Sequence, residues 1–294
     1  MELKIDKLDK TYGNNHALNE FTYTFTEGIY GLLGPNGAGK STLMNIITDN
    51  LKQDAGWIKV EQKDIKELGK EYRKLLGYMP QQQGVYPGFT LGRFLYYIAS
   101  LKGLTKAKAK EQIEWILPLV NLTDCLERKL GAFSGGMKQR ALIAQAMIGN
   151  PKIIILDEPT AGLDPKERIR IRNMIAKIAF DKIVIIATHV VSDIEFIAKE
   201  VLLLKKGNLI DAGSPVDLCS KIKNKTFHIN TQMENIETIS EQYKVCNISK
   251  EKEGIQVRVL SDHGVTGYDY EVAKPTLEEL YLYTFDESEK KVLA

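Results

Sequence analysis

The main pattern along the chain is a series of short apolar runs separated by longer stretches with helical spacing. Residues 21–25 alternate apolar and polar positions, which predicts a half-buried antiparallel strand. Residues 153–156 and 183–187 are continuously apolar and of strand length, a pattern typical of central strands in a parallel sheet covered on both faces. Between them, isoleucines recur at near-helical spacing within residues 166–179. This alternation predicts a layered α/β fold.

A different pattern occupies residues 91–147, where most signals are helical and few indicate strands. Within it, residues 111–120 place their apolar side chains on one face of a helix, and Pro118 is expected to kink or end that helix. We interpret residues of about 90–147 as a helical insert within the α/β core.

The pattern changes again in the last quarter of the chain, where the apolar segments are short. Residues 226–230, 243–248 and 255–260 are expected to be strands. A helix is expected to open at residues 275–280, with a proline and two acids in its first turn. We therefore predict a domain at residues 1–218 and a small α+β accessory domain at 219–294.

Composition narrows the class of protein. The chain has 294 residues, 44% hydrophobic and 27% charged, as expected of a globular protein of about two domains. Its net charge of +2 and pI near 8.2 argue against a dedicated nucleic-acid binder, whose domains usually have a pI above about 9. That charge divides into +5 for residues 1–218 and −3 for residues 219–294.

The apolar runs and the cysteines carry expectations about location. Each apolar run is far shorter than the roughly 18 residues of a membrane span, and the first residues lack the apolar core of a signal peptide. The three cysteines lie far apart and form no CxxC pair, which fits a reducing compartment and argues against zinc. We expect a cytosolic protein without a membrane span of its own.

The strongest chemical signal is a glycine-rich loop between an apolar strand at 29–33 and a helix-like segment at 41–48. It has the full G-x-x-x-x-G-K-S/T pattern: Gly34, Pro35, Asn36, Gly37, Ala38, Gly39, Lys40, Ser41 and Thr42. The glycines let backbone N–H groups turn toward phosphate oxygens, and the helix N-terminus adds about half a positive charge. Lys40 is expected to contact the β- and γ-phosphates, and Ser41 to coordinate Mg²⁺. The motif predicts a P-loop nucleotide binder.

An acidic pair follows the strand at 153–156. Asp157 closes this strand and is expected to hold the Mg²⁺ shell, while Glu158 is placed to polarise a water in line with the γ-phosphate. Acid pairs at strand ends are often only solvated surface groups. The assignment therefore depends on the P-loop in the same chain.

A second glycine motif directly precedes an apolar helix-like run at 141–148. Ser134, Gly135, Gly136 and Met137 offer a hydroxyl and exposed backbone N–H groups at a helix start, which is a second phosphate-binding device. Taken alone, a glycine-rich helix entry is common. Two such devices in one chain make sense if the second serves the nucleotide of another molecule.

These motifs, in this order, resemble the nucleotide-binding subunit of an ABC (ATP-binding cassette) transporter over residues 1–218. The resemblance identifies residues 34–42 as the Walker A motif, residues 156–158 as the end of Walker B and residues 134–137 as the ABC signature. The implied fold is a P-loop NTPase cassette with a central, mostly parallel sheet, an antiparallel β subdomain and a helical insert.

The same resemblance assigns roles to four further residues. They are Tyr12 as the aromatic that stacks on adenine, Gln81 as the Q-loop glutamine, Asp164 in the D-loop and His189 as the switch histidine. Gln81 would reach Mg²⁺ with its amide oxygen, although Gln82 and Gln83 follow it directly. His189 would hold the γ-phosphate and orient Glu158. Tyr12 has the alternative of being an ordinary surface or core aromatic.

The resemblance also implies cofactors and partners. The implied cofactors are ATP and Mg²⁺. The implied assembly is a homodimer or pseudo-dimer of cassettes arranged head to tail. ATP would lie between Lys40 and Ser41 of one subunit and Ser134 to Gly136 of the other. A separate membrane-spanning permease would bind at the cytoplasmic face, at a groove with residues 86–90 at its edge. Hydrolysis through Glu158 would then power transport.

Two departures from the usual signature refine the assignment. Met137 replaces the usual glutamine and Phe133 the usual leucine, and this methionine resembles ABC-2-type exporters, as does the segment at 275–282. Export is therefore expected. The alternative is a soluble ABC ATPase that acts on nucleic acid or ribosomes. A P-loop kinase or GTPase would have no reason for the Ser134 motif.

Overall fold

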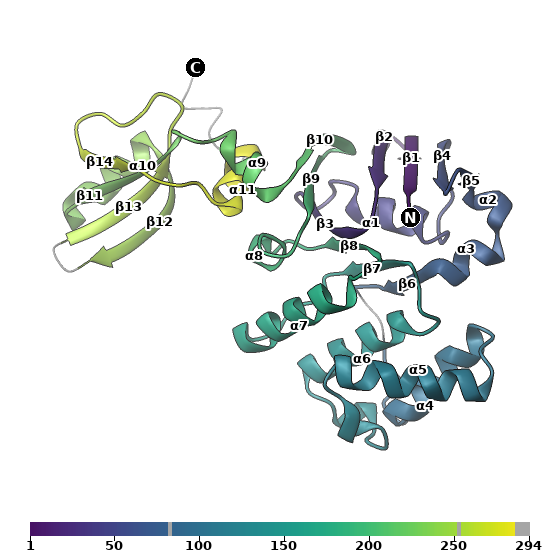
Figure 1. The fold of residues 1–294 in the computed structure, drawn as a ribbon. Coiled ribbons are helices and arrows are strands. Elements are labelled where there is room, and N and C mark those ends of the chain that lie inside the picture. The colour runs from purple at the N-terminus through teal and green to yellow at the C-terminus, as the bar shows by residue number, and fades with distance from the viewer. Residues whose placement is uncertain (82–83, 252–253, 286–294) are drawn as a thin grey trace. The chain divides into compact units, whose positions relative to one another are not determined.

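The computed structural model describes residues 1–81, 84–251 and 254–285, and it divides the chain into two compact units. The first is Met1–Ala212 and the second is Gly213–Ala294. The first unit contains two sheets and the second contains one (Figure 1). Each unit has its own hydrophobic core. None of the helices formed by the described residues has the length and apolar character needed to cross a membrane.

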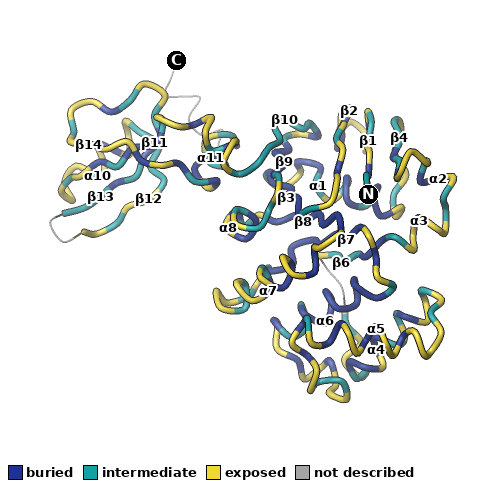
Figure 2. Tube along the Cα trace, viewed as in Figure 1, coloured by how far each residue is buried: buried dark blue, intermediate teal, exposed yellow. Residues whose placement is uncertain are grey.

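A six-stranded, mostly parallel sheet forms the centre of the first unit, in the order β10-β9-β3-β8-β7-β6. Its strands are β3 (Gly28–Leu33), β6 (Leu76–Met79), β7 (Ile153–Asp157), β8 (Ile183–Ala187), β9 (Glu200–Lys205) and β10 (Asn208–Gly213). Every residue of β7 and β8 is buried (Figure 2), which accounts for their continuously apolar sequences. The predicted α/β fold is confirmed.

A second, antiparallel sheet in this unit has the order β2-β1-β4-β5. Its strands are β1 (Leu3–Tyr12), β2 (Asn15–Phe25), β4 (Ala55–Val60) and β5 (Lys63–Asp64). Buried side chains from this sheet, the central sheet and α1 (Lys40–Ile47) form one hydrophobic cluster. The short helices α2 (Ile65–Leu68) and α3 (Lys70–Leu75) lead from this sheet to β6. Shared packing holds α1, and the loop before it, in place between the two sheets.

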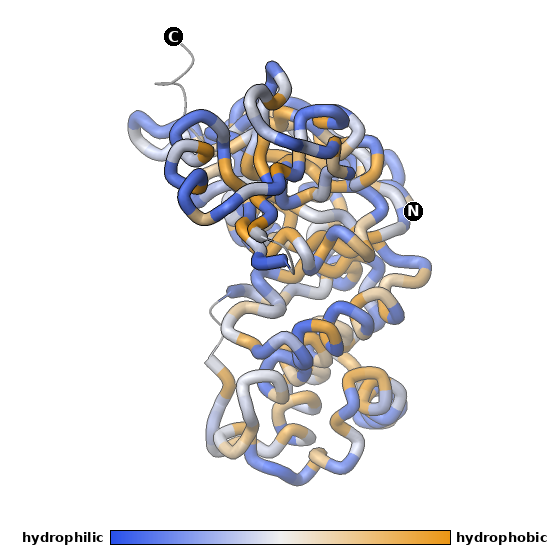
Figure 3. Tube along the Cα trace, turned by 90° about the vertical axis from the view of Figure 1, so that its left-hand side faces the viewer, coloured by the Kyte–Doolittle hydropathy of each residue, from blue (hydrophilic) through white to orange (hydrophobic). Residues whose placement is uncertain are grey.

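The insert is helical, as predicted. It contains α4 (Leu91–Leu101), α5 (Lys106–Leu119), α6 (Gly135–Met147) and the 3-10 helices Thr123–Cys125 and Leu130–Ala132. Pro118 lies in the last turn of α5. Hydrophobic and hydrophilic residues are interspersed along the helices of the first unit (Figure 3). α6 packs on β6 so closely that a Cβ on Gly77 would lie 2.0 Å from the carbonyl oxygen of Ala146. Helix α6 is therefore fixed to the edge of the central sheet.

Two further helices follow strands of the central sheet: α7 (Pro165–Ile178) after β7 and α8 (Val191–Ile194) after β8. Asp164 caps α7, since its carboxylate accepts a hydrogen bond from the backbone N–H of Glu167 at 2.9 Å. The segments that leave β7 and β8 thus emerge side by side, because these two strands are parallel neighbours.

The second unit has an antiparallel sheet in the order β12-β13-β11-β14. Its elements are α9 (Pro215–Ser220), β11 (Thr226–Thr231), the 3-10 helix Met233–Asn235, α10 (Ile236–Gln242), β12 (Lys244–Glu251), β13 (Gly254–Leu260), β14 (Asp269–Val272) and α11 (Leu277–Phe285). α9 packs on α11, so this unit begins at Gly213, six residues before the boundary expected from the sequence. α11 begins at Leu277, which leaves Pro275 before the helix.

Candidate functional site

The loop between β3 and α1 has a backbone that its glycines make possible. Gly37 has φ 79° and Gly39 has φ 105°, both in a region that side-chain-bearing residues rarely adopt. A Cβ on Gly39 would also lie 2.3 Å from the carbonyl oxygen of Ala17. The loop therefore fits against β2 only with glycine at this position, and it enters α1 at Lys40.

The ammonium group of Lys40 lies over this loop. Its Nζ donates hydrogen bonds to the carbonyl oxygens of Gly34 at 2.5 Å and Pro35 at 3.0 Å. Burial lowers the pKa of Lys40, and the nearby carboxylates of Glu158 and Asp157 oppose this by favouring the charged form. A cation is thus held at the loop in a partly desolvated position, where its attraction to an anion is strong.

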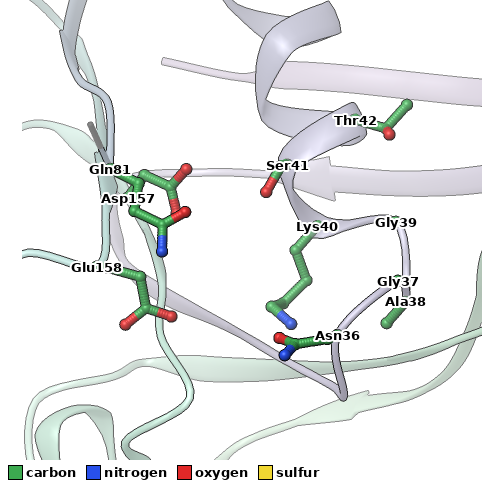
Figure 4. Close-up of a pocket in the computed structure, with 10 residues that line it drawn as sticks. All are labelled: Asn36, Gly37, Ala38, Gly39, Lys40, Ser41, Thr42, Gln81, Asp157 and Glu158. Atoms are coloured by element: carbon green, nitrogen blue, oxygen red, sulfur yellow. The ribbon is translucent and has the colours of Figure 1, made fainter. Parts of the chain in front are cut away.

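A cavity of about 230 Å³ lies between the loop and the ends of neighbouring strands. Its lining residues are Asn36, Gly37, Ala38, Gly39, Lys40, Ser41, Thr42, Gln81, Asp157 and Glu158. Figure 4 shows the loop on one side and Gln81, Asp157 and Glu158 on the other, facing Lys40 and Ser41. The structure therefore brings together most of the residues expected from the first glycine motif and the acidic pair. Gln82 and Gln83 lie outside the described residues.

Asp157 is the last residue of β7 and is 7% exposed. Burial raises the pKa of its carboxyl to about 6, the charge of Glu158 adds to this rise, and Lys40 opposes it. A cation that enters the cavity would stabilise the ionised form of this buried carboxylate.

Glu158 is buried and fixed by the segment that follows β8. Its backbone N–H donates to the carbonyl oxygen of Ala187 at 2.9 Å. Its Oε1 accepts a hydrogen bond from the backbone N–H of His189 at 3.0 Å, and its Oε2 accepts one from the Thr188 hydroxyl at 3.3 Å. Nδ1 of His189 lies 3.0 Å from Oε2, and the His189 side chain is 65% exposed. Sequence reasoning assigned no role to Thr188, whose adjacency to His189 was the only available signal.

The second glycine motif lies at the start of α6 and does not line this cavity. The Ser134 hydroxyl accepts a hydrogen bond from the backbone N–H of Met137 at 3.3 Å and so caps the helix. Ser134 and Gly135 are exposed, while Gly136 is buried against Glu167 of α7. The motif thus presents a capped helix N-terminus to solvent.

Two other expected site residues also lie outside the cavity lining. Tyr12 ends β1 and is 49% exposed, and Nζ of Lys10 lies 5.6 Å from the centroid of its ring. Asp164 stands at the exposed start of α7, as described above. Neither residue lines the cavity itself.

The comparisons with known proteins agree with this geometry. A sequence profile of the family described as "ABC transporter" matches residues 18–161. The linearmycin resistance ATP-binding protein LnrL of Bacillus subtilis (strain 168) is 34% identical over 228 residues, covering 76% of this chain and 73% of the relative. The Nod factor export ATP-binding protein I of Burkholderia orbicola (strain AU 1054) is 31% identical over 213 residues, covering 71% and 69%.

Among solved structures, a dimeric ATP-binding cassette in a post-hydrolysis state bound to ADP and Pi has a TM-score of 0.64. It is 27% identical, and the match covers 72% of this chain and 98% of that one. The mostly parallel sheet, the glycine loop facing Asp157 and Glu158, and these similarities lead to one assignment. The chain belongs to the ABC transporter family, as one of its ATP-binding proteins.

Proposed function

We propose that the chain binds and hydrolyses ATP to power export of a substrate through a separate membrane permease. The observation that carries this proposal is the cavity in which the glycine loop and Lys40 face Asp157 and Glu158. This arrangement combines a phosphate cradle, a cation and a buried carboxylate near the expected position of the terminal phosphate.

ATP would enter with its phosphates on the loop. The backbone N–H groups of residues 37–42 and the N-terminus of α1 supply partial positive charge, and Lys40 would exchange its two carbonyl acceptors for phosphate oxygens. The exposed ring of Tyr12 is free of side-chain packing over much of its surface and would stack on adenine.

The donor set of the cavity fits Mg²⁺. The described residues hold no group of three His, Cys, Asp or Glu side chains that could bind a metal alone. Mg²⁺ typically takes one or two carboxylates together with hydroxyls, water and substrate phosphates, which matches Asp157, Ser41 and Gln81. When bound there, Mg²⁺ would neutralise charge on the phosphate oxygens.

Glu158 would act as the general base for the attacking water. Its carboxylate has hydrogen bonds from Thr188 and His189, which hold it toward the cavity. The exposed side chain of His189 would reach the γ-phosphate, so that one residue would contact both the base and the phosphate that water attacks, while ADP leaves.

The Ser134–Met137 motif and Asp164 would serve the ATP of a second cassette. Ser134, Gly135 and Asp164 are exposed outside the chain's own cavity, which supports a head-to-tail dimer with ATP between the subunits. The dimeric state of a similar solved cassette supports a dimer. The second subunit would be identical or closely similar.

Transport would need a permease that binds the chain at the cytoplasmic face of the membrane. Two of the similar proteins are named for linearmycin resistance and for Nod factor export, and these names support export. Tyr86, Phe89 and Tyr97 form an aromatic cluster by the loop at 86–90, with Tyr86 49% exposed, and this cluster would border the docking groove. No observation favours nucleic acid or ribosomes as the partner.

Paired substitutions in the purified chain test the proposal. Lys40→Ala should abolish ATP binding, whereas Glu158→Gln should keep ATP affinity and lower hydrolysis by about 1,000-fold or more, because it removes only the base. Lys63→Ala and Glu111→Gln, which change exposed side chains, are the matched controls. ATP binding is measured by equilibrium dialysis and turnover by phosphate release. Full turnover by Glu158→Gln, or unchanged binding by Lys40→Ala, would contradict the proposal.

A further inference from the structure

The turn that follows β7 carries Glu158 in a backbone conformation that needs outside support. Glu158 has φ 51°, in the left-handed region that is strained for a residue with a side chain. The backbone N–H of Ala161 closes the turn on the carbonyl oxygen of Glu158 at 3.2 Å. Conformations of this kind persist where surrounding contacts fix them.

One of these contacts is made by Thr160, two residues after Glu158. Thr160 is 2% exposed, and its hydroxyl donates a hydrogen bond to Oδ2 of Asp193. Asp193 lies on α8 and is itself only 6% exposed. Its other oxygen, Oδ1, accepts a hydrogen bond from Nη2 of Arg168 at 3.1 Å. A buried carboxylate is thus compensated by one cation and one hydroxyl.

The turn is therefore held at two points by one segment, residues 188–193. Thr188 and His189 hold the carboxylate of Glu158, and Asp193 holds Thr160 on the far side of Pro159. Arg168 ties the same aspartate to α7, the helix that begins directly after Asp164. Asp193 consequently joins the segment after β8, the turn after β7 and the start of α7.

We propose that Asp193 is a positioning residue for hydrolysis, which fixes the turn of Glu158 through the hydroxyl of Thr160. This inference rests on the proposed role of Glu158 as the general base. Loss of the Thr160 contact would let the turn relax and displace the Glu158 carboxylate from its line to the γ-phosphate. Displacement by about 1 Å can cost as much as 100-fold in rate. ATP binding, which depends on the loop and α1 across the cavity, would be unaffected.

The test uses Thr160→Val, which removes the hydroxyl at nearly constant volume, and Thr160→Ser, which retains it. In the full chain, Thr160→Val should lower kcat about 10-fold or more while the Kd for ATP stays within about twofold, and Thr160→Ser should recover most of the rate. Thr226→Val is the matched control, because Thr226 is fully buried and its hydroxyl has no hydrogen-bond partner among the described residues. Its kcat should equal that of the unaltered chain.

A double-mutant cycle with Asp193→Asn completes the test. If Asp193 acts through Thr160, the double variant should lose no more kcat than the worse single variant. A kcat of Thr160→Val equal to that of the unaltered chain, multiplied losses in the double variant, or a loss of ATP-binding sites parallel to the loss of rate would each overturn the inference. Absence of hydrolysis by the unaltered chain would instead contradict the proposed function.

Discussion

Asp157 is the residue whose protonation is altered most clearly by the cavity. Its pKa of about 6 lies above its ordinary value because the carboxylate is buried, and because Glu158 adds a second negative charge. The folded chain therefore binds a proton at Asp157 more readily than the unfolded chain does. Above pH 6 the ionised carboxylate lowers stability, and this cost disappears as the pH falls through 6 toward 4.

The expected size of this effect is about 3 kcal/mol at pH 7.5 for the nucleotide-free chain, at about 1.4 kcal/mol for each tenfold change in proton affinity. Asp157→Asn should therefore unfold at higher urea than the unaltered chain at pH 7.5, with the difference vanishing near pH 4. Tryptophan fluorescence is the measurement, because both tryptophans, Trp57 and Trp115, lie in the first unit. The exposed Asp124→Asn is the control. A difference that does not change with pH would refute this account of the carboxyl.

At the scale of elements, α11 shows how one side chain can fix a helix to a sheet. Glu279 is 6% exposed, and its Oε2 accepts hydrogen bonds from the backbone N–H of Thr276 at 2.6 Å and from its hydroxyl at 2.7 Å. The same carboxylate pairs with Arg258 of β13, with 2.7 Å between Nε and Oε1. Glu279 thus caps α11 and anchors it to β13 at once.

Glu279→Ala should free both Thr276 and Arg258 from their contacts with this carboxylate. Removal of one member of a buried ion pair lowers the free energy of unfolding by about 3 kcal/mol. Amide hydrogen exchange in α11 and β13 should then become about 100-fold faster, which mass spectrometry of the exchanging full chain measures. The neighbouring Glu278 is exposed on the same helix turn, so Glu278→Ala should leave exchange unchanged. Equal exchange in both variants would show that this ion pair does not hold the helix.

How far the sequence predicts these elements depends on whether their signal is local. The glycine loop, β7 and β8 were predictable because residue type and spacing alone dictate them. β14 was not, since all four of its residues are exposed and only backbone pairing with β11 makes it a strand. The contact between Thr160 and Asp193 also had no signal, because it joins residues 33 apart through the alignment of β7 and β8.

At the scale of the whole molecule, the proposed site is divided between two chains. In the first unit the glycine loop and the acidic pair line a shared cavity, while the Ser134 motif faces solvent outside it. ATP bound in the cavity would place negative phosphates against the capped N-terminus of a partner's α6. ATP itself would then hold two chains together, and hydrolysis would release them.

The most direct test of the proposal that ATP joins two chains is the mass of Glu158→Gln in solution. Light scattering determines this mass with and without Mg²⁺ and ATP. We expect the 33.1 kDa monomer without nucleotide and twice that mass at saturating ATP, because binding is kept and hydrolysis is blocked. Adding Ser134→Arg to the same chain should restore the monomer while ATP remains bound. A monomer at saturating ATP, or a dimer that forms equally well without it, would contradict the account.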